Sequence, residues 1–216
     1  MSKQSHIIFD LDQLHDRCEE VNPIDAQATV KELVAKLKKY PDLYALSAPQ
    51  IGIKERVICL KFNDGVIKEY INPVPLKAEK LHLVRERDIS IADKEFITPR
   101  PGKLFVQYLT QDARPEENKF EGVVAEVFVR MVNYLDGITP VDFGLEVLPE
   151  FDEASKDEQQ QVIDMYLNSL KQKAEQLEKD IKQDKEASEL LDAIRFMAAV
   201  DSGRVQLVDK PVDQIK

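Results

Sequence analysis

The residue types that most often carry chemistry in proteins are scarce in this chain. His6 and His15 belong to the N-terminal segment. His82 stands alone among alternating apolar and polar residues, which is typical of a half-exposed strand position. Cys18 and Cys59 lie far apart within apolar patterns, so two free buried thiols are expected rather than a disulfide. No serine-hydrolase, P-loop or dinucleotide-binding motif accompanies them.

One stretch, residues 45–52, has the composition of a segment whose backbone approaches a ligand. Pro49 fixes its own φ angle and has no N–H to donate, so Ala48-Pro49 predicts a pinned turn or an edge segment. The amide of Gln50 can both donate and accept a hydrogen bond. Gly52 then leads into a strand that is apolar enough to be buried on both faces. Two interpretations are open: a substrate-side loop, or a structural turn.

Composition and charge exclude several classes of function. The chain is 43% hydrophobic and 32% charged, which is ordinary for a globular domain with or without an appendage. Its net charge of −10 argues against a nucleic-acid partner, because affinity for phosphate backbones comes from clustered Lys and Arg. No apolar run reaches about 18 residues and no leader pattern is present. We therefore expect no membrane contact and a cytoplasmic location.

Hydrophobic periodicity predicts an α+β domain over residues 1–149. One helix is expected from Asp25, as its N-cap, to Tyr40, and a second over 121–135, ending at Gly137. Because strands lie between the helices without βαβ alternation, the class is α+β. The expected strands are 57–62 and 66–71 joined by a hairpin turn and closed by 72–75, several short strands over 80–98, and 104–108.

A helical extension is predicted for residues 150–216. A short heptad seam runs through its acidic first part, and with fewer than about three heptads it could pack on its own domain or pair with another chain. We favour a protein partner through residues 150–216, in a homo- or hetero-oligomer. A helix over 187–200 and a terminal strand over 205–208 are also expected. The seam consists of Ile163, Leu167, Leu170, Ala174, Leu177 and Ile181.

The stretch at 45–52 resembles the first motif of the peptide deformylases, G-φ-G-φ-A-A-P-Q-I-G with φ apolar. Residues 46–52 match its second half closely, and Ala45 replaces a Gly. Ile71-Asn72-Pro73 resembles the family's signature after the hairpin. The resemblance covers roughly residues 7–148. It implies a peptide-deformylase-like fold, with antiparallel or mixed strands around the helix at 121–135, to which the helical extension is added.

The resemblance also implies a metal hydrolase, but the positions that would carry its chemistry are replaced. In the family, a Cys of E-G-C-L-S and two His of H-E-x-D-H hold a divalent metal, usually iron. The Glu of the second motif transfers a proton. Here Asp88 stands at the Cys position, and Arg130, Met131 and Tyr134 stand at the first His, the Glu and the second His. Arg130 offers no lone pair to a metal, and Met131 cannot carry a proton.

These replacements predict that the chain is not an enzyme and has no catalytic residue, cofactor or metal. An Asp88–Arg130 ion pair is expected at the metal position, the alternative being two solvated surface charges. Gln50 matches the family residue that helps to hold the oxyanion. Without a nucleophile beside it, Gln50 is expected to tie its loop to neighbouring backbone.

The expected function is that of a catalytically inactive structural or assembly subunit of a larger complex. Because deformylase genes also occur in bacteriophages, a virion component is one version of this hypothesis. Two alternatives are a peptide-binding module that uses the substrate cleft implied by the resemblance, and a hydrolase of altered chemistry. The hydrolase would use Glu86, Asp88, Gln50 and Tyr134, since two carboxylates can do acid–base work where burial raises one pKa.

Overall fold

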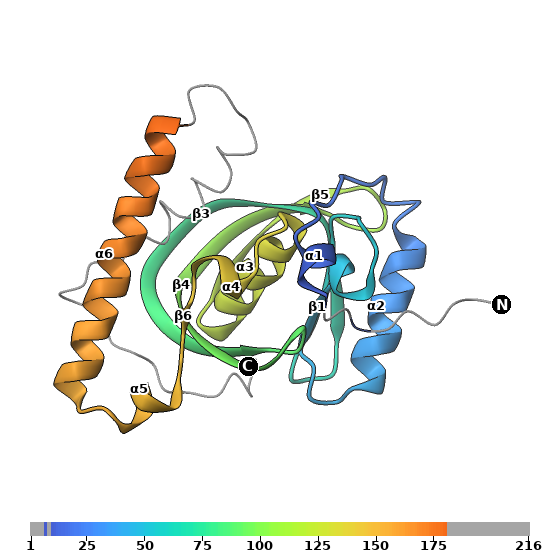
Figure 1. Cartoon of the computed structure of the whole chain (residues 1–216). Helices are drawn as coiled ribbons and strands as arrows, with labels where there is room; N and C mark the ends of the chain where they lie inside the picture. Colours follow the sequence, from blue (N-terminus) through green and yellow to red (C-terminus); the bar gives the residue numbers. More distant parts are fainter. Residues whose placement is uncertain (1–6, 8–9, 181–216) are drawn as a thin grey trace.

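The structure is a computed structural model that describes residue 7 and residues 10–180 (Figure 1). The helix expected over 187–200 and the strand expected over 205–208 lie outside the described residues. Helices cover both faces of one sheet (Figure 1). The helices are α1 (Leu11–Leu14), α2 (Gln27–Lys39), the 3₁₀ turn η1 (Ala48–Ile51), α3 (Val123–Leu135), α4 (Pro140–Phe143), α5 (Pro149–Glu153) and α6 (Lys156–Asp180).

All strand pairs within the sheet are antiparallel, in the spatial order β1-β2-β3-β4-β5, with β6 paired to β4. Antiparallel strands with helices on their faces make up the α+β class that the sequence predicts, so this expectation is confirmed. The strands are β1 (Ala45–Ser47), β2 (Val57–Lys61), β3 (Ile67–Asp88), β4 (Ile91–Leu109), β5 (Pro115–Glu121) and β6 (Leu145–Glu146).

β3 and β4 form a hairpin of two long strands, 22 and 19 residues, that curves around α3 (Figure 1). The predictions of several short strands over 80–98 and of a strand end at 72–75 are therefore wrong. Pro73 and Pro75 cannot donate hydrogen bonds to the ladder. The pairing register shifts between Ile71 and Val74 and again between Pro75 and Lys77. The strand continues past these irregularities, although their local sequence is typical of a strand end.

Both long helices predicted for the first 149 residues are present, but Asp25 does not cap α2. The N-cap is Ala26, which makes no side-chain capping bond, and the chain enters the helix through a turn in which Ala26 N donates to Asn22 O. α3 ends at Leu135 with Asp136 as its C-cap, and Gly137 follows with a φ of 71°, in the terminating position that the sequence predicts. A Cβ on Gly137 would come within 2.4 Å of the His15 carbonyl oxygen, so this close approach requires glycine.

The core lies on the two faces of β2. Ile58 and Leu60 belong to the cluster that packs around α3, and Val57 and Cys59 belong to the cluster that packs under α2. The prediction of a strand buried on both faces is confirmed. Cys18 is buried with the α3 cluster, and both cysteines are free thiols, as expected. α3 is thereby held against the sheet by apolar packing.

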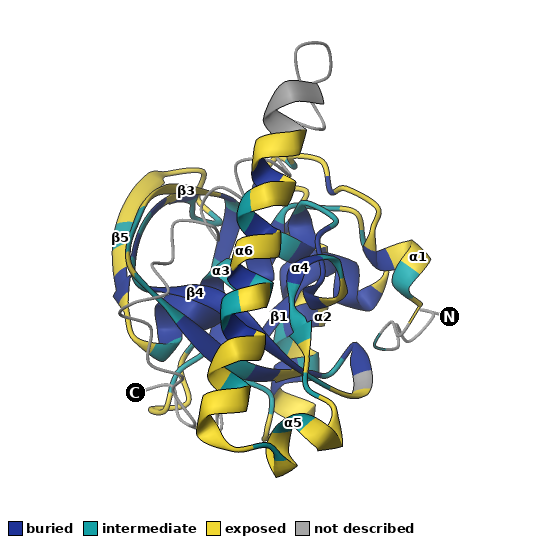
Figure 2. Cartoon of the chain, turned by 60° about the vertical axis from the view of Figure 1, so that its left-hand side comes forward, coloured by how far each residue is buried: buried dark blue, intermediate teal, exposed yellow. Residues whose placement is uncertain are grey.

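α6 packs on the outer face of the β3–β4 hairpin, and its remaining surface is exposed (Figure 2). Ile163 and Leu167 contact the cluster of Leu83 and Ile97. These two seam residues are therefore buried on the chain's own sheet, and Leu170 and Ala174 are buried as well. A protein partner for residues 150–216 stays a prediction, as does the domain boundary at residue 149.

The docking of α6 predicts unequal effects for two alanine substitutions on that helix. Leu167 is 0% exposed and Met165 is 72% exposed. Leu167→Ala should lower the free energy of unfolding by about 2–5 kcal/mol, because it removes buried methyl groups and leaves a cavity. Met165→Ala is the matched control and should change it by less than about 0.5 kcal/mol. Urea unfolding of both variants measures the difference, and equal effects would contradict the docking.

Candidate functional site

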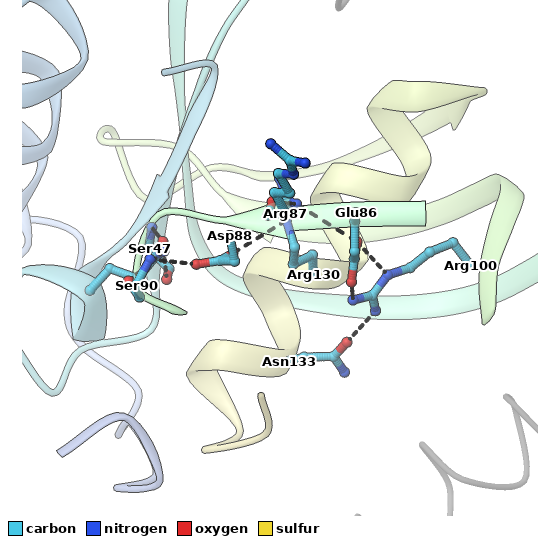
Figure 3. Close-up of polar contacts among 9 residues, drawn as sticks. Ser47, Glu86, Arg87, Asp88, Ser90, Arg100, Arg130 and Asn133 are labelled. Carbon is cyan, nitrogen blue, oxygen red and sulfur yellow. Dashed lines mark hydrogen bonds and ion pairs between the residues drawn. The ribbon is translucent and has the colours of Figure 1, made fainter. Parts of the chain in front are cut away.

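Polar side chains from β3 and α3 meet on the inner side of the long hairpin. Alternate residues of a strand share a face, and helix residues four apart share a face, so each element contributes a row. Figure 3 shows Glu86 and Asp88 of β3 beside Arg130 of α3, with Arg100 reaching in from β4. Further along, His82 Nε2 lies 2.8 Å from Glu126 Oε1. Strand and helix periodicity together place these groups.

Glu86 is the centre of this cluster, and its side chain is 4% exposed. Arg100 donates to its carboxylate from Nη2 at 2.5 Å and from Nε at 3.3 Å. The same guanidinium donates from Nη1 to Asn133 Oδ1 at 2.7 Å and stacks over the ring of Phe143. Burial would raise the pKa of Glu86, but the charges of Arg100 and Arg130 outweigh burial and hold that pKa below its usual value. Glu86 is therefore an anion.

Arg130 lies between the two carboxylates. Its Nη1 is 3.7 Å from Glu86 Oε2 and its Nε is 3.7 Å from Asp88 Oδ2, while Nη1 donates to the Arg87 carbonyl oxygen at 3.0 Å. Burial would lower the pKa of Arg130, but the negative charges of Glu86 and Asp88 raise it above its usual value. The predicted Asp88–Arg130 ion pair is present. The alternative of two solvated charges is wrong, since these side chains are only 3% and 12% exposed.

Asp88 and Tyr134 complete the inner part of the cluster. Asp88 Oδ1 accepts a hydrogen bond from Ser90 N at 2.8 Å, which fixes the turn between β3 and β4. Tyr134 is fully buried, and burial together with the charge of Asp88 raises the pKa of its phenol. Tyr134 is therefore a neutral phenol and not a phenolate.

Gln50 joins the turn at residues 48–51 to this cluster. Its Oε1 accepts from the backbone N and the Oγ of Ser47, both at 3.1 Å, and its Nε2 donates to Ser90 Oγ at 3.2 Å. The amide thus ties its own loop, as expected from the sequence, and also contacts the turn that Asp88 fixes. It is buried and uses both its donor and its acceptor side within the protein.

The residues at this site do not fit the metal that the family resemblance implies. Asp88 offers carboxylate oxygens, but Arg130 has no lone pair and brings a positive charge, and Tyr134 is protonated. Met131 packs in the apolar core around α3. Among the described residues, no three His, Cys, Asp or Glu side chains are grouped so that they could hold an ion.

A separate pocket of about 870 Å³ lies beside α3, between the segment at 17–20 and residues 74–78 of β3. Of the polar cluster, only Asn133 lines it. Gln50, Asp88 and Arg130 do not contribute to its walls. The pocket is therefore not the site that the sequence motifs indicate.

Sequence reasoning found part of the site. It paired Asp88 with Arg130 and assigned Gln50 a structural contact, but it missed Arg100 and Asn133 as members. Glu86 entered only as one of two carboxylates for acid–base work, and its lowered pKa does not fit that role. His82 is a half-exposed residue of β3, as expected, but its contact with Glu126 was not foreseen. Its bond to Glu126 joins two elements far apart in sequence, so no local pattern signals it.

Comparison with known proteins gives a consistent result. The polypeptide deformylase family model matches residues 7–144. A peptide deformylase of Thermoanaerobacter pseudethanolicus is 27% identical over 122 residues, 56% of this chain and 76% of that protein.

Two crystal structures share the fold. A probable peptide deformylase from Synechococcus phage S-SSM7 has a TM-score of 0.58 at 24% identity, covering 64% of this chain and 98% of that one. A peptide deformylase of Acinetobacter baumannii with Met-Ala-Ser bound has a TM-score of 0.58 at 23% identity, covering 66% and 99%. The expected deformylase-like fold is confirmed.

The expectation that the chain is not an enzyme is contradicted by these relatives. Curated proteins that are 27%, 30% and 29% identical to it are named peptide deformylase, which is an enzyme. The expectation rested on the residue types at positions 88, 130, 131 and 134. Those residue types bear on metal binding and do not by themselves decide whether the site carries out a reaction.

One observation bears on the expectation that the chain makes no membrane contact. Within the part of the chain that the structure describes, every helix is too short or too polar to cross a bilayer.

The His82–Glu126 pair predicts a pH-dependent contribution to stability. The hydrogen bond to Glu126 raises the pKa of His82 above its usual value, partly opposed by burial. A raised histidine pKa means that the contribution is complete below the unfolded pKa of about 6.5 and is lost as the pH rises through the folded pKa. The difference in unfolding free energy between the wild type and Glu126→Gln should therefore be larger at about pH 5.5 than at about pH 9. Urea unfolding at both pH values measures it, and a constant difference would contradict the prediction.

Proposed function

This chain belongs to the polypeptide deformylase family, whose model matches residues 7–144, and from that premise we propose that it binds an extended peptide along β1. The end of the peptide would lie beside the cluster of Glu86, Asp88 and Arg130. Two features support the proposal: a sheet edge with free backbone groups, and the polar cluster next to it. The Acinetobacter relative is described with Met-Ala-Ser bound, which makes a short peptide the natural first ligand to test.

The observation that carries this proposal is the edge position of β1. Among the described residues, β1 pairs only with β2. Tyr44 O accepts from Lys61 N, and hydrogen-bonded pairs alternate along an antiparallel ladder, so the backbone groups of Ala45 point away from β2. An unpaired strand edge of this kind is a site for β-augmentation, in which main-chain hydrogen bonds provide affinity.

The turn that follows β1 brings this edge to the polar cluster. Ser47 N also points away from β2, and it is satisfied by Gln50 rather than by a strand. Gln50 in turn contacts Ser90, whose backbone N–H binds Asp88. A peptide paired with Ala45 and running toward Ser47 would therefore end next to charged groups. Those groups suit a polar peptide terminus rather than an apolar side chain.

The test is titration of the full chain with Met-Ala-Ser and with its N-formylated form. Ala45→Pro removes the outward N–H without removing a bond to β2, so it should weaken binding about tenfold or more. Because Ala45 is buried in the cluster around α3, urea unfolding of the variant is measured beside the titration, so that lost binding is separated from lost folding. Met165→Ala, on the outer face of α6, is the matched control and should bind like the wild type. Isothermal titration calorimetry measures the affinity.

Formate release in the same reactions separates recognition from turnover. Binding with formate release assigns a hydrolytic reaction to this chain, and binding alone leaves recognition as the function. If neither peptide binds saturably, or if Ala45→Pro binds like the wild type, peptide recognition along β1 is wrong.

A second candidate function is that of a subunit in a larger complex, bound through residues 150–216. The observation in its favour is the exposed apolar surface of α6, where Met165 and Val162 face away from the sheet. A virion location would be one version, and the phage protein among the structural neighbours makes it worth testing. The cytoplasm is the location if no virion is involved.

This candidate predicts an association that depends on the outer face of α6. Met165→Glu combined with Val162→Glu should reduce the mass of the native complex to that of the free chain. The unfolding free energy should change by less than about 1 kcal/mol, because both positions are exposed. Light scattering after size-exclusion chromatography measures the mass. The candidate would be refuted if the wild-type chain has the mass of a monomer both when purified alone and when measured together with the proteins that co-purify with it.

A further inference from the structure

Two carboxylates lie close together in the interior between β3 and α3. The side chains of Glu86 and Asp88 are 4% and 3% exposed. Buried carboxylates require a cation or a proton, because solvation by water is lost. Glu86 is not protonated, since its pKa is held below the usual value. The interior therefore needs positive charge at this point.

The chain supplies that charge itself. Arg100 forms hydrogen bonds to Glu86, and Arg130 lies 3.7 Å from each of the two carboxylates. The formal charges of two carboxylates and two guanidinium groups sum to zero. The other titratable groups of this row, His82 and Glu126, contact each other at 2.8 Å. Arg130 is the only one of these groups that contacts both Glu86 and Asp88.

We propose that Arg130 is a built-in cation that replaces a divalent metal ion at this site. A metal bound between Glu86 and Asp88 would lie within a few ångströms of the Arg130 guanidinium, where like charges repel strongly. Arg130 provides no lone pair, and the neutral phenol of Tyr134 is a poor ligand. The inference does not depend on peptide binding, since it concerns only charges within the chain.

The proposal has an unusual corollary: loss of Arg130 should create a metal site. Without its guanidinium, Glu86 and Asp88 would share one uncompensated negative charge in the interior. A histidine at 130 would add a neutral nitrogen ligand on the same helix face. Arg130→His should therefore bind Zn²⁺ or Ni²⁺ with a stoichiometry near one. Arg130→Lys, which keeps the positive charge, is the matched control and should bind neither.

The experiment uses the full-length protein, with metal content measured by mass spectrometry and binding by calorimetry. The wild type and Arg130→Lys should retain no stoichiometric metal, and neither EDTA nor added Zn²⁺ should shift their melting temperature. Arg130→His should bind one equivalent and melt at a higher temperature in Zn²⁺, because a ligand of the native state stabilises it. Subtracting the Arg130→Lys signal removes binding by surface groups.

Each result decides the question. Stoichiometric metal in the wild type, or a lower melting temperature in EDTA, would overturn the proposal. Equal metal binding by Arg130→His and Arg130→Lys would also overturn it. Should Arg130→His fail to fold, folding in the presence of Zn²⁺ is measured instead. Rescue by Zn²⁺ supports the built-in cation, and failure of Zn²⁺ to rescue counts against it.

Discussion

The need to neutralise two carboxylates inside the protein governs how this molecule is assembled. Glu86 and Asp88 point from β3 toward α3, where water cannot solvate them. A buried charge without a counter-ion is strongly destabilising, so β3 and α3 can pack only if cations come with them. Arg100 arrives from β4 and Arg130 from α3. The hairpin and the central helix are therefore joined by charge as well as by their apolar core.

Much of the fold follows from local pattern, and the failures share one cause. The period of α3 and the two-sided apolar character of β2 are visible in the sequence, because both are properties of consecutive residues. The length of β3 is not, since Pro73 and Pro75 have the composition of a strand end. The strand continues only because β4 runs beside it and absorbs the register shifts. Pairing with a distant segment overrides the local signal.

The same distinction applies to the site. The Asp88–Arg130 contact could be predicted because a family motif aligned two positions 42 apart in number. No motif connects Arg100 to Asn133 or His82 to Glu126, so these contacts emerge only from the folded chain. Residue types at the ligand positions also led to a wrong expectation about catalysis. The residue types at these positions show which ligands the site cannot bind. The names of the relatives instead state the activity of those relatives.

The shared neutrality of the cluster also limits how this sequence can change. Glu86, Asp88, Arg100 and Arg130 form one electrical unit, so replacing any one of them leaves an excess charge in the interior. Substitutions at these positions should be tolerated in compensating pairs rather than singly. A lineage moving between this arrangement and a metal-binding one must therefore cross a destabilised intermediate. The ion-pair cluster acts as a barrier to evolutionary reversal as much as a support for the fold.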